Sequence, residues 1–188
     1  MKKQLFIGAL LSLVSSSVYA HGGHTGHVFL AGFTHPFSGI DHVLVMLAIG
    51  LWAGKIGGAA RWQLPLTFVV IMAISAMIGV GGMPSLEMGV AASVMAMGLL
   101  LVLSFPINRA IQLSLTAIFA TLHGFAHGSE LSFENGTQVL LGMVLATALL
   151  HGAGLLFASQ QNKMSRLIHT ALGWLTFLAG GYMLLAAS

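Results

Sequence analysis

The hydrophobic pattern of the chain consists of six long apolar segments separated by short polar stretches. Each segment is close to the ~20 residues that an α-helix needs to cross ~30 Å of hydrocarbon. The polar separators are too short to form a soluble domain. The pattern therefore predicts an all-α, polytopic membrane protein with six transmembrane helices. The predicted helices are 37–54, 64–82, 86–105, 110–128, 136–158 and 167–187.

The first twenty residues have the pattern of a cleavable signal peptide. Lys2 and Lys3 precede an apolar run, and Val18-Tyr19-Ala20 matches a small-residue cleavage site. An uncleaved first transmembrane helix is the alternative. With cleavage, the chain divides into a signal peptide (1–20), a His/Gly-rich extracytoplasmic N-terminus (21–36) and a six-helix membrane domain (37–188).

The charged residues give an independent prediction of orientation. A signal peptide places the mature N-terminus outside the membrane, so the later loops must alternate between the two sides. All Lys and Arg residues of the mature chain then fall in cytoplasmic loops, as the positive-inside rule requires. They are Lys55, Arg61, Arg109, Lys163 and Arg166. We expect a multi-pass protein of the bacterial inner membrane whose mature N- and C-termini are both periplasmic.

Composition narrows the chemistry. Hydrophobic residues make up 57% of the 188 residues and charged residues only 6%, against about a quarter charged in soluble chains. The few charges are scattered, which argues against a nucleic-acid partner. The chain has no Cys, which excludes disulfides and thiolate metal sites. Nine His residues remain, and in a membrane protein each polar side chain has a cost that calls for a reason.

The first polar motif is His35-Pro36-Phe37-Ser38-Gly39-Ile40-Asp41-His42, at the outer end of the first predicted helix. On a continuous helix His35 and His42 would share a face but lie about 10 Å apart. Pro36 and Gly39 permit a broken helix instead, which would fold His35 back toward Asp41 and His42. The alternative for Asp41 is a simple helix N-cap at the membrane interface.

The second polar motif is His123-Gly124-Phe125-Ala126-His127-Gly128-Ser129-Glu130, at the outer end of the fourth predicted helix. At 100° per residue, His123, His127 and Glu130 lie on one narrow stripe. This spacing can chelate a divalent ion, although His residues four apart can also hydrogen-bond to neighbouring helices. Both motifs are predicted at the same membrane depth. Imidazole with carboxylate suits Zn²⁺, Ni²⁺, Co²⁺ or Cu²⁺.

The other His residues are predicted at different depths across the membrane. His21, His24 and His27 lie in the Gly-rich N-terminus, where metal capture is the favoured role. His151 lies about fifteen residues into the fifth predicted helix, where it is either a deeper binding step or a packed core residue. His169 is predicted at the inner interface, with an inner exit as the alternative.

With these motifs, the sequence resembles the HupE/UreJ family of small membrane proteins, regarded as nickel or cobalt permeases. The resemblance rests on the His-rich start, on H-P-x-x-G-x-D-H and on H-G-x-A-H-G-x-E. It implies metal-site roles for a set of six residues and a functional link to hydrogenase, urease or cobalamin pathways. The six are His35, Asp41, His42, His123, His127 and Glu130.

The resulting hypothesis is a secondary permease that imports Ni²⁺ or Co²⁺ and carries no resident cofactor. The absence of a Walker motif excludes ATP hydrolysis by this chain. A membrane-embedded metal-dependent hydrolase or oxygenase is one alternative, but H-E-x-x-H and G-x-S-x-G are both absent from the sequence. A metal sensor or accessory protein that does not transport is the other.

Overall fold

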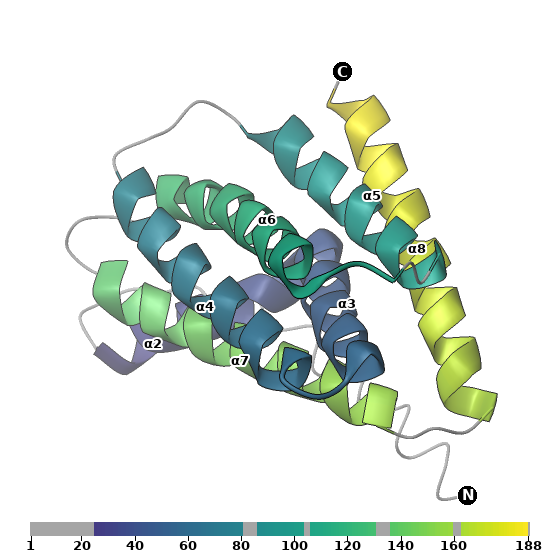
Figure 1. Cartoon of the computed structure of the whole chain (residues 1–188). Coiled ribbons are helices and arrows are strands. Elements are labelled where there is room, and N and C mark those ends of the chain that lie inside the picture. Colours follow the sequence, from purple (N-terminus) through teal and green to yellow (C-terminus); the bar gives the residue numbers. More distant parts are fainter. Residues whose placement is uncertain (1–24, 81–85, 104–105, 131–135, 160–162, 188) are drawn as a thin grey trace, which may run out of the picture.

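The computed structural model describes residues 25–80, 86–103, 106–130, 136–159 and 163–187 (Figure 1). Within these ranges every regular element is an α-helix, which confirms the predicted all-α class. The predicted signal peptide, His21 and His24 lie outside the described residues. The helices are α2 (Thr25–Ser38), α3 (Ile40–Ile56), α4 (Ala60–Gly79), α5 (Glu87–Leu103), α6 (Arg109–Glu130), α7 (Gly136–Ser159) and α8 (Lys163–Ala186).

Three helices are long and apolar enough to cross a membrane by length and composition: α4, α7 and the Arg166–Ala186 part of α8. The pair α2 and α3 would make a fourth span if the two count together. Helix α5 is apolar but has only 17 residues. Helix α6 has 22 residues, and its imidazoles and other polar side chains lower its hydropathy. The protein thus has the helices of a multi-pass membrane protein, with fewer clear spans than the six predicted.

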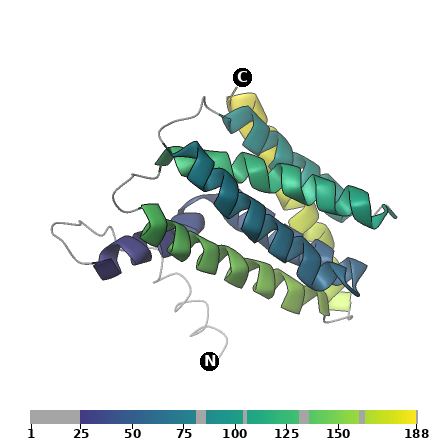
Figure 2. The same ribbon diagram turned by 60° about the vertical axis from the view of Figure 1, so that its left-hand side comes forward.

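The first predicted span, 37–54, is not one continuous helix. The chain breaks at Gly39, whose backbone is extended (φ −103°, ψ 121°), and α2 meets α3 at a bend of 82° (Figure 2). Pro36 lies in the last turn of α2, where it removes a backbone donor. The broken arrangement that Pro36 and Gly39 permit is therefore the one observed. Helix α2 itself was not expected, because the sequence analysis placed residues 21–36 in an N-terminus outside the membrane domain.

The helices pack in close pairs: α4 with α6, α5 with α8, and α3 with α7, while α2 packs on α7. Glycine allows these approaches. A Cβ added at Gly50 would overlap the backbone carbonyl of His151, and one added at Gly124 would overlap that of Met72. Gly58 has a different role, because it lies in the α3–α4 turn with φ +54°.

The direction of each close pair follows from which residues meet. Along α4 and α6 the contacts advance together, from Gly124 beside Ser75 to Gly128 beside Gly79, so these two helices are parallel. Helices α3 and α7 are parallel by the same criterion. Helices α5 and α8 are antiparallel, because Gly98 meets Phe177 whereas Gly180 meets Met95. These are the relative directions that six alternating spans would require.

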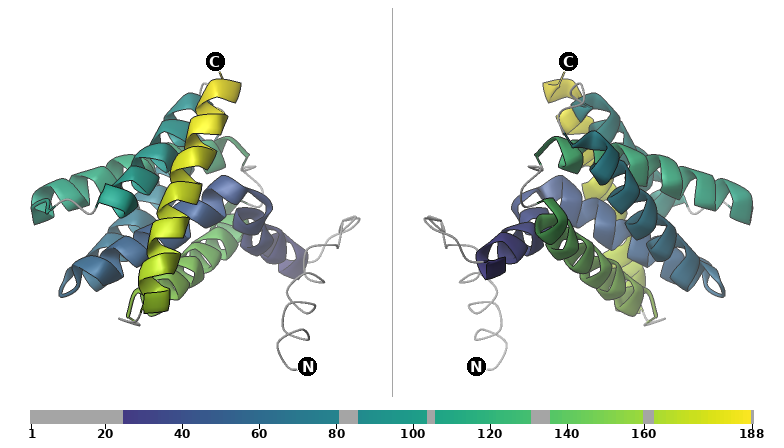
Figure 3. Two further views of the ribbon diagram at one scale, coloured as in Figure 1. Left: turned by 90° about the vertical axis from the view of Figure 1, so that its right-hand side faces the viewer. Right: turned by 90° about the vertical axis from the view of Figure 1, so that its left-hand side faces the viewer.

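Helix α3 lies at the centre of the bundle and contacts α2, α4, α5, α7 and α8 (Figure 3). Nearly all its residues from Leu44 to Ala53 are buried. The outer helices instead present large apolar side chains outward, among them Ile74, Leu149 and Leu178, each at least half exposed. Apolar surfaces this extensive are typical of helices that face lipid.

Candidate metal centre

The break between α2 and α3 positions the first two imidazoles. Gly32 of α2 and Gly142 of α7 allow the two backbones to touch, which fixes α2 against α7. His35 lies in the last turn of α2, and the Ser38 hydroxyl donates a hydrogen bond of 2.6 Å to its carbonyl oxygen. His42 lies in the first turns of α3. The bend turns both rings into the same space, and their centroids are 5.9 Å apart.

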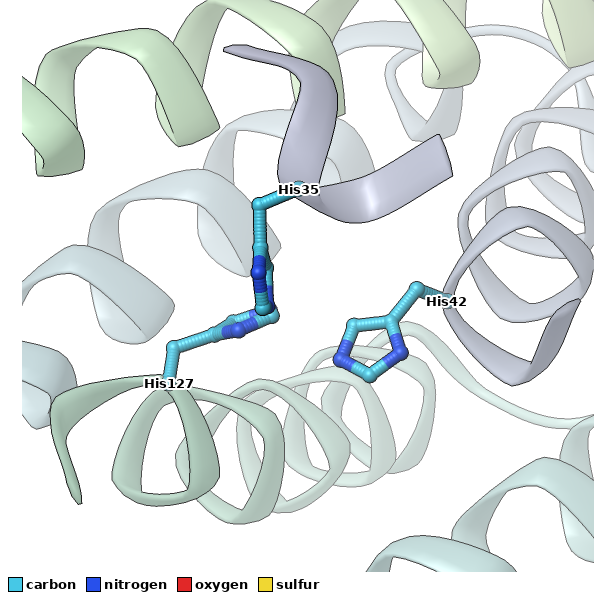
Figure 4. A group of neighbouring side chains, drawn as sticks. All are labelled: His35, His42 and His127. Carbon is cyan, nitrogen blue, oxygen red and sulfur yellow. The ribbon is translucent and has the colours of Figure 1, made fainter. Parts of the chain in front are cut away.

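His127 of α6 completes a cluster of three imidazoles with His35 and His42. One ring nitrogen from each of the three lies within 4.8 Å of the other two, and the three side chains point into the same space between their helices (Figure 4). The His127 ring lies 4.6 Å from that of His42 and 5.1 Å from that of His35, between centroids. An ion with bonds of about 2.1 Å keeps its ligand atoms roughly 3–3.5 Å apart. Small side-chain rotations would therefore close the cluster around one cation.

Asp41 supplies the negative charge beside this cluster. Its Oδ1 lies 2.9 Å from His42 Nδ1, and both side chains are about 15% exposed. Asp41 is not the N-cap of α3, because Gly39 occupies that position. A carboxylate held against a ligating imidazole orients the ring and raises its basicity, which is the usual second layer of a metal site.

His123 lies one turn deeper on α6 and is fully buried. Its ring packs edge-on against His42, at 5.6 Å between centroids. Its Nδ1 lies 3.0 Å from the carbonyl oxygen of Phe119, which accepts the hydrogen bond only if Nδ1 carries the proton. In that tautomer the lone pair is on Nε2, which is buried and has no hydrogen-bond partner. His123 thus presents a neutral ligand atom just below the three-imidazole cluster.

The other predicted site residues whose side chains the structure describes are not part of the three-imidazole cluster. Glu130 is the last residue of α6, and its side chain is outside the described part of the structure. His27 is exposed near the start of α2. His151 is buried within α7, and His169 of α8 is also buried, with 7% exposure.

Two residues that position or adjoin the cluster were not among the predicted metal-site residues. A Cβ at Gly39 would lie 2.6 Å from Asp41 Oδ1 and 2.7 Å from His42 Nδ1, so the absence of a side chain there lets these two groups fold back over the helix start. Phe68 of α4 packs against His123, at 5.8 Å between ring centroids. The sequence did indicate a helix break at Gly39, because it lies with Pro36 in the first polar motif. Phe68 is one apolar residue in an apolar segment, so nothing in the sequence distinguishes it from its neighbours.

Comparison with known proteins shows the family of the chain. The family model described as HupE / UreJ protein matches residues 9–183. The chain belongs to the HupE/UreJ family. Among curated proteins it is 35% identical to Protein HupE of Rhizobium leguminosarum bv. viciae, over 98% of this chain and 99% of that protein. No solved structure matches significantly.

Membership in HupE/UreJ narrows the functional classes. The family is one of transport and accessory proteins and not of enzymes, and it is linked to the nickel metabolism of hydrogenase and urease. The paired His motifs by which the sequence resembled the family supply the three clustered imidazoles.

Proposed function

We propose that this HupE/UreJ protein is a secondary permease that imports Ni²⁺ or Co²⁺ across the bacterial inner membrane. The observation that carries the proposal is the cluster of His35, His42 and His127, contributed by two separate motifs and held beside Asp41. Polar side chains within the helices of a membrane protein are costly and are typically functional. Neutral imidazoles with one carboxylate select transition metals over Mg²⁺ and Ca²⁺, which prefer oxygen ligands.

The proposed topology has six spans, α3 to α8, following a cleaved signal peptide, and both mature termini in the periplasm. The parallel pairs α3–α7 and α4–α6 and the antiparallel pair α5–α8 support this alternation. In this orientation the start of α3 and the end of α6 lie at the periplasmic side. The imidazole cluster would then receive metal from the periplasm, after capture by His21, His24 and His27.

Import needs no ATP in this mechanism. Moving a divalent cation inward through a membrane potential of 100 mV releases about 4.6 kcal/mol. The ligands bind as neutral imidazoles, while Asp41 offsets part of the charge of the cation. A site of this kind holds an ion strongly enough to select it, and the potential favours its release to the inside.

Uptake of radioactive nickel or cobalt in cells that lack their other nickel and cobalt systems tests the proposal. Asp41→Asn keeps the size of the side chain but removes its charge, and His127→Ala removes one ligand. We expect each variant to lower uptake by at least about tenfold, as is usual when the shell of a metal site is damaged. His169→Ala is the matched control, a buried imidazole outside the cluster, and it should retain substantial uptake.

Protein abundance is checked by immunoblot in every strain. Near-normal uptake by both Asp41→Asn and His127→Ala at normal abundance would reject the shared site. Dependence of hydrogenase, urease or cobalamin formation on this protein at scarce metal would identify the pathway that receives the ion.

A further inference from the structure

Deeper than the imidazole cluster, α4 and α7 bring together a second group of chemically distinctive side chains. Phe68 and Met72 lie four residues apart on α4, and Thr147 and His151 lie four residues apart on α7, so each pair shares a helix face. The Thr147 hydroxyl lies 3.8 Å from Met72 Sδ. The Phe68 ring packs edge-on against the His151 ring, at 5.1 Å between centroids. All four side chains are almost completely buried.

His151 has no structural explanation within this group. Both of its ring nitrogens are buried, and neither has a hydrogen-bond partner. Buried polar groups in native proteins are nearly always paired, and a membrane environment raises the cost of leaving one unpaired. A packing role would be better filled by an apolar residue. The imidazole is thus placed for a ligand that is present only part of the time.

Phe68 connects His151 of this group to His123 of α6. Its ring contacts both His151, at 5.1 Å between centroids, and His123, at 5.8 Å. Among the imidazoles of the two His motifs, His123 lies farthest from the outer surface, and its Nε2 is buried without a hydrogen-bond partner. An ion that leaves His123 therefore meets the Phe68 ring before it can reach His151.

We propose that His151, Thr147 and Met72 form a second, transient binding position for the transported metal, and that movement of the Phe68 side chain admits the ion to it. The proposal rests on the permease function above. Imidazole nitrogen, hydroxyl oxygen and thioether sulfur accept Ni²⁺ or Co²⁺, whereas Mg²⁺ and Ca²⁺ require carboxylate-rich oxygen sites. The inner position would thus select transition metals over Mg²⁺ and Ca²⁺, as the outer cluster does.

The ligands of the inner position also explain why an ion would bind there only transiently. The outer cluster has Asp41 beside it, but the three inner ligands are all neutral. A conduction path needs sites that bind well enough to admit an ion and weakly enough to release it. Loss of the inner position should therefore impair transport while leaving binding at the outer cluster intact.

The absence of cysteine from the chain permits a direct test with Co²⁺ as the probe. Thr147→Cys places a single thiol at the proposed position. Thr176→Cys is the matched control, because Thr147 and Thr176 are both fully buried helical threonines and Thr176 lies on α8. A metal ion deprotonates a thiol that it binds, and the thiolate–cobalt pair then absorbs strongly in the near ultraviolet. The purified full-length proteins are titrated with Co²⁺ in detergent.

We expect the thiolate–cobalt band with Thr147→Cys and its absence with Thr176→Cys. Adding His151→Ala to Thr147→Cys should weaken the band at least about tenfold. Met72→Cys serves as the second probe should Thr147→Cys fail to fold. Visible cobalt absorption from the outer cluster, with no thiolate band at position 147 or 72, would overturn the inner position and leave the permease proposal standing. An equal band at position 176 would overturn it too. No cobalt binding by the unmodified protein would reject both proposals.

Discussion

Gly39→Ala should reduce metal affinity while changing folding stability little, which makes it a sharper test than the loss of a ligand. The added methyl group would lie 2.6 Å from Asp41 Oδ1 and 2.7 Å from His42 Nδ1. Ordinary contacts of this kind are about 3.5 Å long, so the two side chains must move by roughly 1 Å. Both clashing atoms are at the ends of side chains that can rotate, and the backbone of α3 is not obstructed.

The expected magnitudes differ for the two properties. A displacement of about 1 Å at a reacting or binding centre can cost 100-fold, and damage to the supporting shell of a metal ligand costs about 10–100-fold in affinity. That range corresponds to roughly 1.4–2.7 kcal/mol of binding free energy. Replacing the glycine N-cap by alanine costs less than about 1 kcal/mol of folding free energy. Metal affinity should therefore fall more than stability does.

The assay is titration of the purified protein with Ni²⁺ by calorimetry, together with its thermal unfolding. Gly152→Ala is the control, because a Cβ at Gly152 of α7 meets nothing within 4 Å. It should leave Ni²⁺ affinity unchanged and stabilise the protein slightly, by up to about 1 kcal/mol. Unchanged Ni²⁺ affinity in Gly39→Ala would refute the geometry assigned to Asp41 and His42.

Three further predictions follow from the packing and the cluster. The double variant Asp41→Asn with His127→Ala should take up scarcely less metal than either single variant in a double-mutant cycle, because ligands of one ion act together. Gly50→Ala should lower the melting temperature and abundance, at about 1–3 kcal/mol of overpacking against the His151 carbonyl, whereas Gly181→Ala, whose nearest contact is 3.8 Å away, should not. Replacing His21, His24 and His27 by alanine, which leaves the length of α2 unchanged, should reduce uptake at scarce metal only, as a titration of external nickel would reveal.

The hydrophobic pattern predicted the helices of the membrane domain well. The bounds of α3 to α8 lie within four residues of the predicted segments, and the largest differences are at Ala60 and Lys163, where helices begin earlier than 64 and 167. Apolar runs near membrane length leave little freedom in where a helix forms. Polar residues such as Arg61 can extend such a helix beyond the apolar run, and hydropathy does not reveal that extension.

Helix α2 was not predicted, because its stability comes from tertiary contact. It has only 14 residues, and isolated helices of that length are marginal in water. Its packing depends on Gly32 meeting the α7 backbone near Val139, which no local pattern reveals. The motif did indicate a break near Gly39, and that break is what brings His35 to His42.

The pairing of the two His motifs was predictable from membrane depth, but the depth argument could not say which residues touch. The structure joins His35, His42 and His127 and places His123 one turn below. Phe68 was not identified from the sequence because its distinguishing feature is contact with two imidazoles from other helices. Contacts between side chains of different helices can be identified only from the packed structure.

Flux through the purified protein in sealed vesicles tests the central claim most directly. Full-length protein is reconstituted into liposomes with an inside-negative potential, and accumulation of radioactive nickel is measured beside the His127→Ala variant. We expect the unmodified protein to accumulate nickel in proportion to the potential, and the variant to match empty liposomes. Nickel binding by the unmodified protein without any accumulation above empty liposomes would contradict the permease and indicate a metal sensor or accessory protein.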